Sequence, residues 1–182
     1  MNKPIVLAVS SSSSHTFSKH IQPSIKLIAG IGVEGDAHAG KTVKHRYLVK
    51  IDSTKPNIRQ VHLIQTELFD ELKEKGFKIS SGELGENITT KGVNLLELPK
   101  GTKLEIGDEV VVELTALRNP CIQIDNFQKG LLKEVLQQDE NGNLIRKGGV
   151  MGVVLSGGEI FPGDSIKVVL PEKPFQQLEY IW

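Results

Sequence analysis

The chain has 182 residues, of which 38% are hydrophobic and 24% are charged, and its 22 basic and 22 acidic side chains balance to a net charge of zero. This length suits one globular domain, and the neutral balance gives no reason to expect a nucleic acid or an anionic membrane as partner. The single cysteine excludes an intrachain disulfide. The apolar run 4–9 is too short for a signal-peptide core, and no run could span a membrane. We therefore expect one cytoplasmic domain over residues 1–182, with its core at about 30–170 and a tail at 171–182 that packs on the body.

The first half of the chain is dominated by short alternating segments. Period-two alternation predicts strands over residues 5–9, 25–33, 60–64 and 88–90. The serine run 10–14 ends the first of them. One helix is expected from Thr66 to Lys75, because Leu68, Phe69 and Leu72 share one face and Gly76 provides a stop.

The second half repeats the same pattern around Gly-Asp turns. Residues 103–114 predict two strands joined at Gly107-Asp108, and residues 161–170 predict another strand after a similar turn. A short helix is expected over 131–138 and a flexible cationic loop over 146–149. The pattern predicts a mainly β, barrel-like fold with two or three small peripheral helices.

Two glycine motifs point to nucleotide binding but lack their context. Residues 30–35 match the dinucleotide-binding glycine pattern, and residues 35–42 match the phosphate-loop pattern. Both motifs need a strand before and a helix after, within alternating βα units. Residues 41–50 are basic and lack a clean apolar face, so we expect no nucleotide site here. The basic stretch 41–59 leaves two interpretations, a solvated loop or a rim that binds anions.

Three histidines and one aspartate raise the possibility of a metal site. These are Asp36, His38, His45 and His62. Imidazole suits zinc and iron, but the spacing matches no standard ligand set and there is no second cysteine. Ordinary hydrogen-bonding roles for these histidines are the alternative.

The only cysteine, Cys121, follows an alternating strand and precedes a polar helical segment. Asn119 is a good N-cap and Pro120 fits the first helical position, which would place Cys121 in the first turn of a helix. A helix N-terminus favours thiolate over thiol, and Arg118 would strengthen this effect if its side chain turned inward. The alternative is a buried cysteine that only packs.

Five motifs, taken together, resemble a known family. In chain order they are Gly35-Asp36-x-His38-x-Gly40, Arg59-Gln-Val-His-Leu-Ile64, Gly82-x-Leu-Gly-Glu-Asn-Ile-Thr89, Arg118-Asn-Pro-Cys121 and Pro162-Gly-Asp164. This order is similar to that of MOSC domains, named after the C-terminal domain of molybdenum cofactor sulfurases, and the resemblance covers about residues 30–170. It implies a strongly twisted β-barrel fold in a stand-alone, single-domain type without a cysteine desulfurase domain.

The resemblance also implies a site. Cys121 matches the family cysteine and would ligate a metal or accept sulfur, since thiolate suits both tasks. The other residues that it implies as cofactor-binding are Asp36, His38, Arg59, His62, Gly85, Glu86, Asn87, Arg118 and Arg146. Among these, arginines suit a phosphate or dithiolene-pterin anion, and the Asn87 amide suits a pterin edge. Asp36 and His38 are expected to order the pocket.

Three functions stay open at this point. The resemblance implies a protein that binds a molybdenum cofactor (molybdopterin) through Cys121 and reduces N-hydroxylated substrates, with a redox partner protein and a small-molecule substrate. The alternative is a sulfur carrier that takes persulfide sulfur on Cys121 from a pyridoxal-phosphate cysteine desulfurase and delivers it to a metal-sulfur centre. The third is a small-molecule-binding module whose cysteine is only structural.

Overall fold

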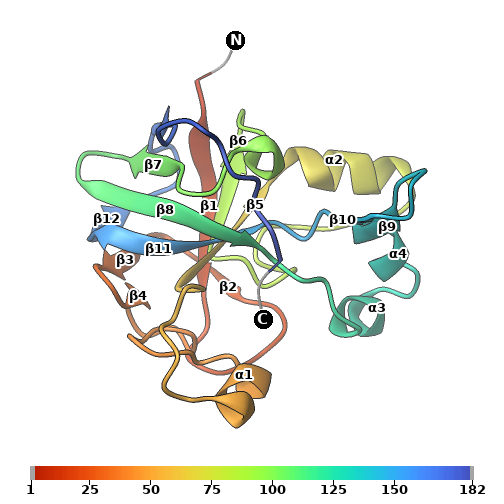
Figure 1. Ribbon diagram of the computed structural model, residues 1–182, viewed down its shortest axis with the longest axis horizontal. Helices are drawn as coiled ribbons and strands as arrows, with labels where there is room; N and C mark the ends of the chain where they lie inside the picture. Colours follow the sequence, from red (N-terminus) through yellow and green to blue (C-terminus); the bar gives the residue numbers. More distant parts are fainter. Residues whose placement is uncertain (1–2, 181–182) are drawn as a thin grey trace.

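The fold is built on one large twisted sheet, shown in a computed structural model that describes residues 3–180 (Figure 1). In spatial order its strands are β13 (Ile166–Val169), β7 (Lys103–Ile106), β8 (Val110–Leu117), β11 (Val150–Ser156), β5 (Val61–Gln65), β6 (Ile88–Lys91), β1 (Ile5–Ser11) and β2 (His20–Gln22). Neighbouring strands are antiparallel except β5 and β6, which are parallel. The helix α2 (Glu67–Glu74) connects that parallel pair, as a parallel connection requires.

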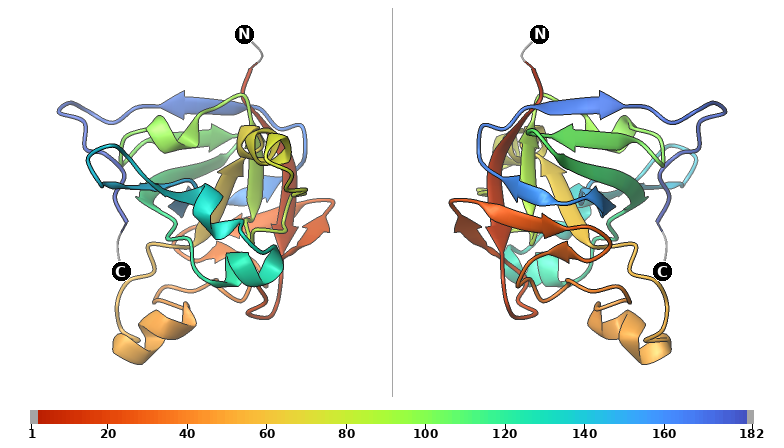
Figure 2. Two further views of the ribbon diagram at one scale, coloured as in Figure 1. Left: turned by 90° about the vertical axis from the view of Figure 1, so that its right-hand side faces the viewer. Right: turned by 90° about the vertical axis from the view of Figure 1, so that its left-hand side faces the viewer.

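Smaller elements surround this sheet. They are the sheet of β12 (Gly158–Ile160), β3 (Ile25–Ile28) and β4 (Gly32–Val33), the hairpin of β9 (Leu136–Gln138) and β10 (Leu144–Arg146), the helices α1 (Arg46–Ile51), α3 (Gln123–Phe127) and α4 (Leu132–Val135), and the 3-10 helix η1 (Leu95–Glu97). Helix α1 projects from the body, whereas α2, α3 and α4 lie on one side of it (Figure 2).

The large sheet curls so that its two ends approach each other. The Val6 amide donates to the Asp164 carbonyl at 2.9 Å, and the Ile166 amide donates to the Pro4 carbonyl at 2.8 Å. These bonds join the start of β1 to the start of β13, so the sheet wraps around one apolar interior. The mainly β, barrel-like prediction is confirmed.

Two apolar clusters hold the fold. The larger one fills the inside of the curled sheet, with fully buried residues such as Leu63, Leu104 and Leu114. The smaller one joins α2, α3 and α4 to the sheet through Leu72, Ile124, Val135 and their neighbours. This second cluster matters for function because it fixes α3, directly after the only cysteine.

Most predicted elements are confirmed. The strands expected over 5–9, 60–64, 88–90 and 103–114 all occur, although β1 continues through Ser10 and Ser11. Helix α2 has Thr66 as its N-cap and Lys75 as its C-cap, and its three apolar residues are buried as expected. The chain leaves the helix through Gly76 at a φ of 90°, a backbone angle that favours glycine.

Three local predictions were wrong. Residues 25–33 form a hairpin of β3 and β4 because Gly30, with a φ of 69°, allows a tight turn. The helix expected over 131–138 stops at Val135, since Leu136–Gln138 pairs with Leu144–Arg146, so Arg146 ends a strand and does not open a loop. Four small α-helices occur within residues 3–180, in place of two or three, because the basic stretch contains α1.

The end of the C-terminal segment contacts the body. Leu178 is buried, and Tyr180 pairs with Leu117 at the end of β8. Trp182, also part of the expected tail, lies outside the described residues. Among residues 3–180, no helix is both long and apolar enough to cross a membrane.

Candidate functional site

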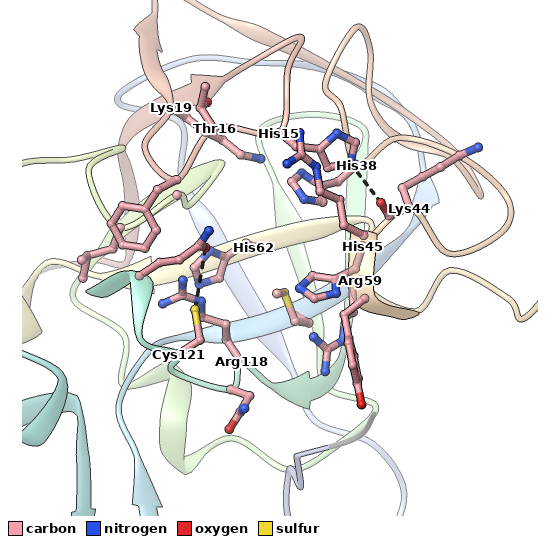
Figure 3. Close-up of a pocket in the computed structure, with 18 of the residues that line it drawn as sticks. His15, Thr16, Lys19, His38, Lys44, His45, Arg59, His62, Arg118 and Cys121 are labelled. Atoms are coloured by element: carbon pink, nitrogen blue, oxygen red, sulfur yellow. Dashed lines mark hydrogen bonds between the residues drawn. The ribbon is translucent and has the colours of Figure 1, made fainter. Parts of the chain in front are cut away.

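A cavity of about 480 Å³ opens where several loops meet beside β5 (Figure 3). Its walls come from the segments 15–19, 38–47, 57–62, 84–87 and 118–123, with Met151 of β11. These segments are far apart in the sequence, so the cavity exists only in the folded chain. The volume falls in the range of small-molecule sites.

The cavity is strongly cationic within a neutral chain. It is lined by five lysines and arginines and by four histidines, namely Lys19, Lys44, Arg46, Arg59, Arg118, His15, His38, His45 and His62. No aspartate or glutamate of residues 3–180 contributes to its wall. A cavity lined by one sign of charge concentrates counter-ions, so this pocket favours an anionic ligand.

Cys121 lies in this cavity, just before α3. The Arg118 amide donates to the Gly149 carbonyl at 2.9 Å, which ties the end of β8 to the start of β11. Ile124 is fully buried in the second apolar cluster and anchors α3 on the other side. Between these anchors, Cys121 is half-buried, and its thiol lies 3.7 Å from the Gln123 side-chain oxygen, a weak hydrogen bond.

The predicted helix start was wrong. Helix α3 begins at Gln123 with Ile122 as its N-cap, so Asn119 does not cap it and Cys121 lies before its first turn. The Cys121 carbonyl accepts a hydrogen bond from the Ile124 amide at 3.0 Å, and the helix begins three residues later than Pro120 suggests. The helix N-terminus expected beside Cys121 therefore lies after it, and the charged neighbour of Cys121 in the same cavity wall is Arg118.

Arg118 carries an unused hydrogen-bond donor into the pocket wall. Burial lowers the pKa of its guanidinium, while Cys121 and Glu86 act in the opposite direction. Its Nη1 is buried and has no hydrogen-bond partner within residues 3–180, and the group lies 6.0 Å from the centre of the Phe17 ring. A buried donor without a partner is costly, so this arginine is arranged to receive an acceptor from a ligand.

His62 is buried beside Arg118 and stays neutral. Its Nε2 donates to the Gly148 carbonyl at 2.8 Å. Burial, followed by the nearby Arg118 charge, lowers the pKa of His62 to about 3. The chain passes so close to this ring that a Cβ at Gly149 would collide with it and with the Leu63 carbonyl. His62 therefore shapes the floor of the pocket and adds no positive charge to it.

Asp36 lies behind the cavity wall opposite Cys121, and its hydrogen bonds hold that wall in place. Its Oδ2 accepts from Lys19 Nζ at 2.7 Å, from Asn87 Nδ2 at 3.0 Å and from the Ser12 amide at 3.3 Å. Its Oδ1 accepts from the His38 amide at 2.9 Å and lies 3.3 Å from the His38 Nδ1. Burial alone would raise the pKa of Asp36, but His38 and Lys19 lower it to well below its usual range. The carboxylate is thus ionised and fully engaged.

The MOSC domain family model matches residues 35–167, which is most of the chain and includes every residue of this arrangement from Asp36 to Cys121. The chain belongs to the MOSC domain family. This family is associated with molybdenum cofactor sulfurase-type proteins. No curated protein matches the chain.

Solved structures share the MOSC fold. The YuaD protein of Bacillus subtilis is 20% identical with a TM-score of 0.75, over 94% of this chain and 98% of that one. YiiM from Geobacillus stearothermophilus is 16% identical with a TM-score of 0.67, over 96% and 80% of the two chains. YiiM from Escherichia coli is 15% identical with a TM-score of 0.61, over 97% and 74%. At these identities the likeness concerns the fold alone.

The MOSC motifs meet around the cavity, but not all of their residues line it. The cavity wall includes His38, Arg59, His62, Gly85, Asn87, Arg118 and Cys121. Asp36 lies behind it. Asn87 donates both amide hydrogens inside the protein, to the Ser10 carbonyl and to Asp36, and its Oδ1 accepts from the His62 amide. The Asn87 amide therefore joins β1, β5 and the Asp36 loop.

Besides Asp36, two other predicted cofactor-binding residues, Glu86 and Arg146, lie outside the wall. Glu86 is fully buried, and its Oε1 accepts from the Gly82 amide at 2.6 Å and from the Thr89 hydroxyl at 3.0 Å. Burial raises the pKa of this carboxyl. Arg146 stacks 4.7 Å from the centre of the Tyr180 ring and donates to Asn119 at 3.2 Å. Its hydrogen bond to Asn119, which does line the cavity, connects it to the site.

Sequence reasoning missed several residues of the wall. His15 donates from Nε2 to the Lys44 carbonyl at 2.9 Å, and its ring meets the His38 ring edge-on at 4.9 Å. Lys19 is buried although nothing in its local sequence indicates this. Lys44 belongs to the basic stretch, which fits the interpretation of that stretch as an anion-binding rim.

The histidines do not form a metal site by themselves. Within residues 3–180, no group of three or more histidine, cysteine, aspartate or glutamate side chains could hold an ion. His45 lines the cavity with a buried Nδ1 that has no partner in the described chain, and burial, followed by Arg59, lowers its pKa. A metal in this pocket would need most of its ligands from a bound molecule.

Proposed function

We propose that this pocket binds a molybdopterin-type cofactor, with the Cys121 thiolate as the protein ligand to its metal, and that the loaded protein reduces N-hydroxylated substrates. The observation that carries the proposal is the location of the only cysteine. It lies in a cavity lined by five lysines and arginines and, among the described residues, by no carboxylate.

The charged residues fit such a group. A pterin-dithiolene with a phosphate is an anion, and Arg118 offers a buried N–H without a partner while Arg59 lies in the same wall. Guanidinium groups bind phosphate and similar anions through paired hydrogen bonds. The cavity volume of about 480 Å³ suits a molecule of this size.

The metal chemistry fits as well. The described chain offers no complete ligand set, but a dithiolene brings two sulfur ligands with it, so a single cysteine thiolate suffices as the protein ligand. When bound, the cofactor would supply a two-electron redox centre. The chain would hold it through Cys121 and the arginines, and His62, which lines the same cavity with a lowered pKa, would add no positive charge near neutral pH.

Native mass spectrometry tests this proposal. The protein would be isolated rapidly and without reductant from cells that make molybdenum cofactor, beside Cys121→Ala and the control His20→Gln, whose residue is exposed and outside the cavity. We expect a pterin-plus-molybdenum adduct in the wild type and the control, absent from Cys121→Ala. The loaded wild type should then reduce a hydroxylamine. An adduct retained in Cys121→Ala would contradict the ligand role.

A second function is favoured by the accessibility of Cys121. The cysteine is half-buried, and its neighbour Ile122 is 64% exposed, so a partner protein can approach the thiol. As a sulfur carrier, the Cys121 thiolate would attack the outer sulfur of a desulfurase persulfide. A new S–S bond forms on Cys121, the old one breaks, and the desulfurase thiol leaves, so no external oxidant is needed.

The same mass measurement separates the two functions. Extra sulfur on the wild type, removable by reductant and absent from Cys121→Ala, would favour the carrier. The His20→Gln control should carry the same sulfur as the wild type. A bare polypeptide in all three samples would favour a structural cysteine.

A further inference from the structure

We propose that His38, held by Asp36, is the proton donor of this pocket and protonates the leaving hydroxyl of an N-hydroxylated substrate. The inference rests on the proposed reductase function. The family resemblance implies only that His38 orders the pocket, whereas here it has a chemical role. Asp36 acts as a positioning residue behind it.

The contacts of Asp36 fix which ring nitrogen of His38 faces the pocket. Asp36 is ionised because Lys19 lies 2.7 Å from its Oδ2 and because it accepts several further hydrogen bonds. An ionised carboxylate can only accept, so the His38 Nδ1 at 3.3 Å must donate to it. No hydrogen bond within residues 3–180 engages the other nitrogen, Nε2. That nitrogen is therefore available to a bound molecule.

The His38 ring is held but still accessible. The His15 ring packs edge-on at 4.9 Å, and Asn57 donates to the His38 carbonyl at 2.9 Å. The His38 side chain is nevertheless 30% exposed and lines the cavity. Figure 3 shows His38 and His15 on the side of the pocket opposite Cys121 and Arg118. A substrate between the two walls would meet the cofactor on one side and His38 on the other.

The other histidines of the wall are less suited to this role. His62 uses its Nε2 on the Gly148 carbonyl, and its pKa of about 3 leaves it without a proton to give near neutral pH. His15 uses its Nε2 on the Lys44 carbonyl. Burial and the Arg59 charge lower the pKa of His45. His38 alone among these four combines a carboxylate behind one nitrogen with an unengaged second nitrogen.

The proposed step balances with the cofactor class already named. The N–O bond of the hydroxylamine breaks and its electron pair leaves with oxygen. The doubly protonated His38 ring donates its Nε2 proton to that oxygen and keeps its Nδ1 hydrogen on Asp36, so the leaving group departs as water. When bound, the cofactor would supply the two electrons that nitrogen needs, and nitrogen takes a second proton from solvent to give the amine. His38 then recovers its Nε2 proton from solvent.

Long-range proton–nitrogen NMR of the cofactor-free protein tests the geometry. The neutral His38 ring should be in the Nδ1–H tautomer, because Asp36 accepts that hydrogen. Comparison of the spectra with those of His38→Gln assigns the signal, and His20→Gln identifies an exposed histidine for reference. A neutral His38 with its hydrogen on Nε2 would overturn the proposed role of Asp36, whatever the fate of the reductase proposal.

Kinetics of the loaded protein test the chemistry. His38→Gln should lower kcat by about 100-fold or more, the usual worth of general acid catalysis. Its KM and its cofactor content should remain within about two-fold, because a residue that acts only in the transition state contributes little to binding. His20→Gln should match the wild type. A His38→Gln protein that keeps its cofactor and its kcat would overturn the donor role.

A loaded wild type with no reductase activity would overturn the proposed function and the donation step with it, while the tautomer result still decides the role of Asp36.

Discussion

Two cations, the buried Lys19 and the half-buried Arg118, line the same pocket but differ in their partners. The Lys19 ammonium lies 2.7 Å from Asp36, and both side chains are almost fully buried. Arg118 is half-buried, but its Nη1 is buried and has no partner within residues 3–180. Burial lowers the pKa of both groups, but only Lys19 has its charge neutralised by the protein. The first cation belongs to the structure of the pocket, and the second is arranged for a ligand.

Breaking the buried pair of Lys19 and Asp36 should have the largest effect on the free energy of unfolding. Asp36→Ala leaves the Lys19 ammonium buried without its partner, and we expect it to lower the free energy of unfolding by about 3–5 kcal/mol. Urea denaturation measures this change. The exposed pair of Lys26 and Glu34, 3.5 Å apart, provides the control, since Glu34→Ala should change stability by less than about 1 kcal/mol. Equal effects of the two substitutions would remove the distinction between buried pairing and surface pairing.

His62 represents a third arrangement, a buried group that avoids charge. Its pKa falls from 6.5 to about 3 in the folded protein, so the unfolded chain binds the proton more tightly. The stability that neutral His62 contributes to the free energy of unfolding is therefore fully present above about pH 6.5. Below that pH the free energy of unfolding falls by about 1.4 kcal/mol per pH unit, until the pH approaches 3. His62→Gln can keep the bond to Gly148 and cannot titrate. Urea denaturation between about pH 6.5 and 4.5 should show the wild type losing roughly 2 kcal/mol more stability than the variant. Parallel pH curves would show that His62 is protonated in the fold.

Replacement of Arg118 tests whether its unpartnered donor binds an anion. Arg118→Met keeps the apolar stem but removes the guanidinium, so the affinity for an inorganic anion such as phosphate should fall about 10- to 100-fold, the worth of a charged hydrogen bond. Stability without ligand should hold or rise, because no partner in the described chain is lost with Nη1. Isothermal titration calorimetry and urea denaturation provide the two measurements. Unchanged anion affinity would show that other cations of the wall bind the anion.

The sequence predicted what depends on local pattern. Alternation located β5, β7 and β8, and the apolar face of α2 with Gly76 located that helix. It failed where tertiary partners decide. The turn at Gly30 looked like a continuous extended run, because apolar residues flank it on both sides. The helix after Pro120 begins later than capping chemistry suggests, because the packing of Ile124 sets its position.

The same limit applies to the site. Cys121, Arg118 and the Asp36 loop were predicted as site candidates because each belongs to a motif with recognisable chemistry. Lys19 was missed because a lysine next to a serine-rich loop is usually solvated, and only the long-range contact with Asp36 makes it a buried residue. Arg146 was grouped with the site through the family resemblance, but it stacks on Tyr180. The side chains that complete a pocket come from several loops, and local sequence patterns do not predict which loops meet in the folded chain.

Cys121 should have the smallest effect on stability and therefore distinguishes a functional from a structural cysteine. Its thiol is half-buried and makes one weak contact, 3.7 Å from Gln123, so little packing is lost when oxygen replaces sulfur. We expect Cys121→Ser to change the free energy of unfolding by less than about 0.5 kcal/mol, as for most surface substitutions.

Ile124→Ala, one turn further along, is the matched control and should cost about 2–5 kcal/mol because that side chain is fully buried. A cost for Cys121→Ser close to that of Ile124→Ala would mean that the thiol is part of the core. A negligible cost, together with loss of the cofactor or sulfur adduct, would place the importance of this residue in chemistry and not in folding.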